Sequence, residues 1–123
     1  MNEQKTKQTM DFFAGKIACF QAQAKTLTED NRADEAVFAK IRGNVYDIFR
    51  TVFSAGLNSA GQDGEKAVQF LCAKLRQIPE SWRTALKNAE AHGQVEKAHI
   101  ERIKLETVET IHAEIQKIWE GAL

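Results

Sequence analysis

Apolar residues recur at alternating steps of three and four along residues 10–27, and this spacing constrains the fold more than any other feature of the chain. The residues that follow it are Met10, Phe13, Ile17, Phe20, Ala24 and Leu27. Such spacing is expected of a helix that packs at about 20° against neighbouring helices. We therefore predict a helix over residues 3–29 with one buried stripe.

Three clusters of helix-breaking or polar residues, at 28–32, 56–64 and 92–93, divide the chain into four segments of similar length. Pro79 interrupts the third segment, because proline lacks a backbone donor and clashes with the preceding turn. Proline suits the first turn of a new helix, so a second helix is expected to begin there.

Four such segments, each about 38 Å long if helical, predict an all-α fold. We expect an up-down-up-down four-helix bundle with the third helix broken at Pro79, formed as a single domain by residues 1–123. A long bent hairpin that completes its core only as a dimer is the alternative.

The second segment, residues 32–55, is expected to begin after a capping side chain from Asp30 or Asn31 and to end at Gly56 in the left-handed conformation. At about 100° per residue, its main apolar stripe consists of Val37, Ile41, Val45, Ile48, Val52 and Ala55. Phe38, Tyr46, Phe49 and Phe53 widen this stripe to roughly half of the circumference, whereas a core-facing stripe usually spans about 100°. Arg42 is the one charged residue within the wide arc.

Several aromatic residues lie away from the main apolar stripes, and a single bundle core need not use all of them. They are Phe12, Phe38, Phe49, Phe53 and Phe70. They indicate a wide core around a central second segment, a self-association surface, or a pocket for a small apolar ligand. Because the second segment's apolar arc is too wide for one pair of neighbouring helices, we predict a homodimer that uses these residues as its interface.

The fourth segment, residues 94–120, carries a stripe formed by Ile100, Ile103, Val108, Ile111, Ile115 and Ile118. Lys104 falls inside this arc and is expected to extend its ammonium group towards water. Leu105, His112 and Trp119 flank the stripe at steps of seven. A histidine in an apolar arc is a candidate ligand contact, so His112, Trp119 and Tyr46 form the candidate pocket of an alternative function, a small-molecule-binding regulator.

The pattern Glu-x-x-His occurs twice, as Glu96 with His99 and as Glu109 with His112. Carboxylate-bridged dimetal bundles place one copy on each of two helices. Here both copies lie on one predicted helix, roughly 20 Å apart, so they cannot share a metal pair. We expect solvated surface pairs, and neither a metal nor another cofactor.

The two cysteines, Cys19 and Cys72, do not form a Cys-x-x-Cys motif. They are expected to be inert thiols in or near the core. No combination of residues identifies a catalytic centre.

The charge balance also limits the function classes. Lys plus Arg and Asp plus Glu each number 17, so the formal net charge is zero, which argues against nucleic-acid or polybasic membrane binding. The longest apolar run has four residues, whereas a membrane span needs about 20. Residues 1–9 lack the apolar core of a signal peptide. We therefore expect a cytoplasmic, non-enzymatic helical bundle that acts by protein–protein contact, including contact with itself.

Overall fold

The computed structural model describes residues 2–121 of the 123-residue chain. These residues form α1 (Glu3–Glu29), α2 (Ala33–Ser59), α3 (Gly64–Gln77), α4 (Glu80–Ala91) and α5 (Val95–Ile118), without a β-strand. Because α3 and α4 together make one bent arm, the fold is the predicted all-α four-helix bundle. No helix in this part of the chain is both long and apolar enough to cross a bilayer.

The third arm bends where the sequence predicts a break. Ile78 (φ −58°, ψ −42°) and Pro79 (φ −69°, ψ −7°) both keep backbone angles near the helical region. The amide of Ile78 still donates to the Lys74 carbonyl, and that of Arg83 donates to the Pro79 carbonyl. Helical hydrogen bonding therefore continues on both sides of the proline, and the bend replaces a loop.

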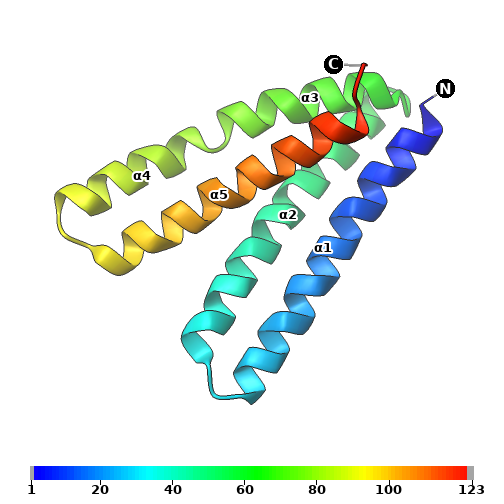
Figure 1. Ribbon diagram of the computed structural model, residues 1–123. Helices are drawn as coiled ribbons and strands as arrows, with labels where there is room; N and C mark the ends of the chain where they lie inside the picture. The colour runs from blue at the N-terminus through cyan, green and yellow to red at the C-terminus, as the bar shows by residue number, and fades with distance from the viewer. Residues whose placement is uncertain (1, 122–123) are drawn as a thin grey trace.

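Helix α2 lies at the centre of the bundle. It contacts α1 along its length and also packs against α3 and α5, whereas α1 and α5 share far fewer contacts. In Figure 1 the α1–α2 hairpin and the α3–α4–α5 hairpin meet at the end that holds both termini, and they extend in different directions from it. One helix thus supplies a buried surface to three neighbours, which requires the wide apolar arc.

The aromatic side of α2 faces the core, and the main apolar stripe predicted for this helix does not. Phe49 and Phe53 are fully buried and Tyr46 is 2% exposed. Of the predicted stripe only Val45 is buried. The prediction of which face is innermost is therefore wrong, because the larger aromatic side chains fill the space between α1, α3 and α5.

Both predicted ends of the second helix also need correction. Gly56 lies within α2, which continues to Ser59. Its lack of a side chain allows the close approach of α3, since a Cβ there would lie 3.2 Å from the Ala67 Cα. Arg32 occupies the N-cap position of α2, and no side-chain cap hydrogen bond is formed. Asn31 instead adopts a positive φ of 59° in the connecting turn.

Candidate interaction surface

The side of α2 that points away from its neighbours carries a second regular stripe. Its members follow steps of four, three, four, three and four, and they are Val37, Ile41, Asn44, Ile48, Thr51 and Ala55. At about 100° and 1.5 Å per residue, these residues stay within an arc of roughly 80° over a length of about 27 Å. We call this set the α2 outer face.

The α2 outer face is accessible and carries no charge. Val37 is 45% exposed and Ile48 is 38% exposed. Asn44, Thr51 and Ala55 are exposed as well, and Ile41 is half-buried. Residues with this spacing normally pack against a second helix, yet five of these six remain exposed in the structure of residues 2–121. Steps of three and four are readable in the sequence, but α2 carries two apolar arcs, and only the structure distinguishes the covered one.

Phe70 extends the apolar surface at the C-terminal end of α2. Its side chain is 41% exposed and lies over Gly56, where a Cβ would come within 3.1 Å of Phe70 Cδ2. A shallow hollow of about 280 Å³ beside the ring is lined by Gly56, Ser59, Ala60, Lys66 and Phe70. Phe70 is thus the most accessible of the five predicted interface phenylalanines.

The other four predicted interface residues lie mostly inside the fold. Phe49 and Phe53 belong to the core. Phe12 is half-buried, with its ring centroid 5.3 Å from that of Phe13 and 5.7 Å from that of Tyr46. The ring of the half-buried Phe38 meets that of His99 edge-on, with 4.7 Å between the centroids. The wide core around a central α2 therefore accounts for most of the off-stripe aromatic residues.

The three residues predicted to form the candidate pocket have different surroundings. Trp119 is fully buried, and its Nε1 donates a hydrogen bond to Thr9 Oγ1. Tyr46 packs against Phe12 and against Phe20, whose ring centroid is 5.6 Å away. Burial raises the pKa of the Tyr46 hydroxyl, and the charge of Glu114 adds to this shift. His112 is half-buried on α5. None of the three lines any hollow described here.

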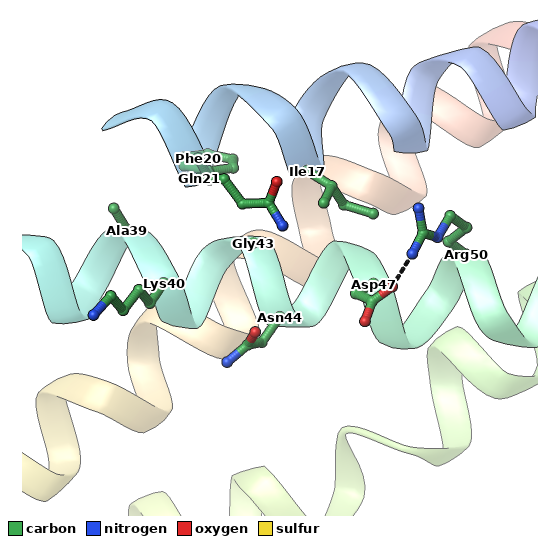
Figure 2. A pocket seen from close by; sticks show the side chains of 9 residues that line it. All are labelled: Ile17, Phe20, Gln21, Ala39, Lys40, Gly43, Asn44, Asp47 and Arg50. Carbon is green, nitrogen blue, oxygen red and sulfur yellow. Dashed lines mark hydrogen bonds and ion pairs between the residues drawn. The ribbon is translucent and has the colours of Figure 1, made fainter. Parts of the chain in front are cut away.

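A hollow of about 290 Å³ lies between α1 and α2 and borders the α2 outer face. Figure 2 shows Ile17, Phe20 and Gln21 reaching from α1 towards α2, with the Asp47–Arg50 ion pair at one end. Its remaining lining residues are Ala39, Lys40, Gly43 and Asn44. With two amides and three charged groups in its lining, this hollow is not the apolar pocket expected from the sequence.

Lys104 was expected to extend its ammonium group towards water, but it pairs with neighbouring side chains of the fold instead. Its ammonium group lies 5.5 Å from the Trp82 ring centroid and 3.3 Å from Glu101 Oε1. Glu101 itself is buried, and its Oε2 has no hydrogen-bond partner among the described residues. No pattern in the sequence indicates that this carboxylate is buried.

Residues 2–121 form neither a cluster of metal ligands nor a disulfide. No three His, Cys, Asp or Glu side chains in this range are close enough to hold a metal ion. Cys19 is exposed on α1 and Cys72 is buried on α3, both as free thiols. Burial raises the pKa of Cys72, with a smaller opposing effect from Arg76.

The chain matches no protein-family model, and no curated protein or solved structure is significantly similar to it.

Proposed function

We propose that this protein acts by protein–protein contact and not by catalysis, and that its partner is a second copy of the same chain. The α2 outer face is the observation that supports this proposal. Its residues have the spacing of a helix–helix contact. Association with a second helix is favourable because it removes the exposed apolar side chains from water.

A second copy suits this face better than a charged partner does. In a two-fold symmetric dimer the same surface meets itself, so any charge at its centre would be opposed by an identical charge. The six residues of the α2 outer face include neither an acidic nor a basic side chain. Self-association therefore brings no like charges together among the six residues of the face itself.

Sedimentation equilibrium tests the proposal. We expect the mass of a dimer at concentrations on the order of tens of micromolar. Ile48→Lys should yield a monomer with unchanged helical circular dichroism, because a buried ammonium group at the middle of the contact is costly.

Val95→Lys is the matched control. Val95 is 79% exposed on α5 and is not one of the six residues of the α2 outer face, so this variant should remain dimeric. A wild-type chain with monomeric mass, or a dimer that Ile48→Lys leaves intact, would contradict the proposal.

A further inference from the structure

We infer that the two copies pair through α2 in antiparallel orientation, with the two-fold axis passing the helices near residue 46. This inference rests on the proposed function and specifies the geometry of that contact. The spacing of the α2 outer face is symmetric about this level. Val37 then lies opposite Ala55 of the other copy, Ile41 opposite Thr51, and Asn44 opposite Ile48.

Charged residues also lie beside the α2 outer face. Asp34, Lys40 and Asp47 are exposed along its edges. An antiparallel pair brings the same edge of both copies together, so each charge is separated from its own copy according to its distance from residue 46. Asp34 and Lys40 lie well apart from their copies, whereas the two Asp47 residues come within about 3 Å of each other along the helix axis, each in an ion pair with Arg50 of its own chain. In the antiparallel pair Lys40 of one copy comes to the level of residue 52 in the other, within two turns of Asp47.

The edge that carries Phe70 offers a complementary ion pair. Lys66 lies beside Ser59 and Ala60 at the C-terminal end of α2, and Asp34 lies in the first turn of α2. A two-fold axis perpendicular to α2 keeps this edge on the same side of both copies and brings opposite ends together. Each Lys66 thus approaches Asp34 of the other copy, and neither side chain forms an ion pair among residues 2–121.

Disulfide cross-linking distinguishes the two orientations. The background is Cys19→Ala with Cys72→Ala, checked for helical circular dichroism and for dimer mass. In this background Val37→Cys and Ala55→Cys are prepared separately, mixed under reducing conditions and then oxidised. We expect a covalent dimer that contains one chain of each kind, and a doubly linked dimer when both substitutions are on one chain.

Each single-cysteine variant oxidised alone is the control, and neither should cross-link, because identical positions lie about 27 Å apart along an antiparallel pair. Cross-linking of Val37→Cys with itself would show a parallel pair and overturn the inference while the proposed function stands. A dimer that cross-links in neither arrangement would overturn the inference as well. A chain that is monomeric before oxidation would contradict the proposed function itself.

Charge reversal provides an independent test. Asp34→Lys and Lys66→Asp should each raise the dimer dissociation constant by about fivefold or more, and their combination should restore it. Asp30→Lys makes the same charge change in the α1–α2 turn and should leave the constant within about twofold. If the combined variant is no tighter than the single variants, the Asp34–Lys66 contact is absent and the antiparallel register is overturned.

Discussion

Trp119 Nε1 donates a hydrogen bond to Thr9 Oγ1 over 2.8 Å, and both side chains are fully buried. The bond joins the end of α5 to the second turn of α1. Thr9 Oγ1 in turn donates to the Lys5 carbonyl over 2.8 Å. These two bonds satisfy the indole N–H and the hydroxyl at the end of the bundle where the two hairpins meet.

Thr9→Val should destabilise the protein by about 1–3 kcal/mol, because the nearly isosteric substitution leaves a buried indole N–H without an acceptor. Thr107→Val is the matched control. Thr107 is also a buried threonine, but its hydroxyl bonds only to the Ile103 carbonyl of its own helix, so the loss should be smaller. Urea denaturation measures both. Equal losses would show that the Trp119 contact adds nothing beyond an ordinary buried hydroxyl.

Gly64→Ala is expected to destabilise the same end of the bundle by about 1–3 kcal/mol, since overpacking forces rigid neighbours apart. An added Cβ would meet the Thr6 hydroxyl and lie 2.9 Å from Trp119 Cη2. Gly15→Ala is the control, because a Cβ at this exposed helical position meets nothing within 4 Å. It should stabilise the chain by up to about 1 kcal/mol. A thermal melt in which both variants move in the same direction would be inconsistent with this packing.

The limits of sequence-based prediction are clear from α2. Steps of three and four located the helix, but they fix only the angle between side chains and do not identify which neighbour each side meets. Val37 and Phe49 lie on different apolar arcs of the helix. The buried arc is that of Phe49, whose larger side chains fill the core without voids. Four residues of the α2 outer face therefore belong to the apolar stripe that the sequence predicts to face the core: Val37, Ile41, Ile48 and Ala55.

Polar contacts between residues far apart in the chain are even harder to predict from the sequence. Thr9 lies at a position of α1 that the apolar spacing skips, and nothing local indicates that a tryptophan 110 residues later needs its hydroxyl. The bend at Pro79 was predictable for the opposite reason, because proline acts through its own ring and the adjacent turn.

Pro79→Ala should change stability by less than about 2 kcal/mol. No hydrogen bond is lost, since proline has no N–H, and both Ile78 and Pro79 already have helical backbone angles. Alanine gives up the contacts of a buried ring and allows the unfolded chain more freedom, which together account for the expected loss. Denaturant titration followed by circular dichroism measures it. Failure of the variant to fold would show that the packing depends on the bend imposed by the ring.

Tyr46 is the single tyrosine in the chain, so the ultraviolet absorbance of tyrosinate reports on this residue alone. Burial, followed by the charges of Glu114 and Cys19, raises the pKa of Tyr46 above its ordinary value. The native protein should therefore titrate at higher pH than the same chain in denaturant. Coincident titration midpoints would contradict the buried position of the hydroxyl.

The same shift predicts how stability depends on pH. The folded state holds the Tyr46 proton more tightly than the unfolded state does. The resulting contribution to the free energy of unfolding is fully present below the unfolded pKa, about 10. It is lost as pH rises through that value towards the higher folded pKa. Tyr46→Phe lacks this contribution, so its free energy of unfolding should fall less steeply over that range than that of the wild type. Parallel denaturant titrations at several alkaline pH values measure the two slopes, and a steeper fall in the variant would reverse the assigned direction of the shift.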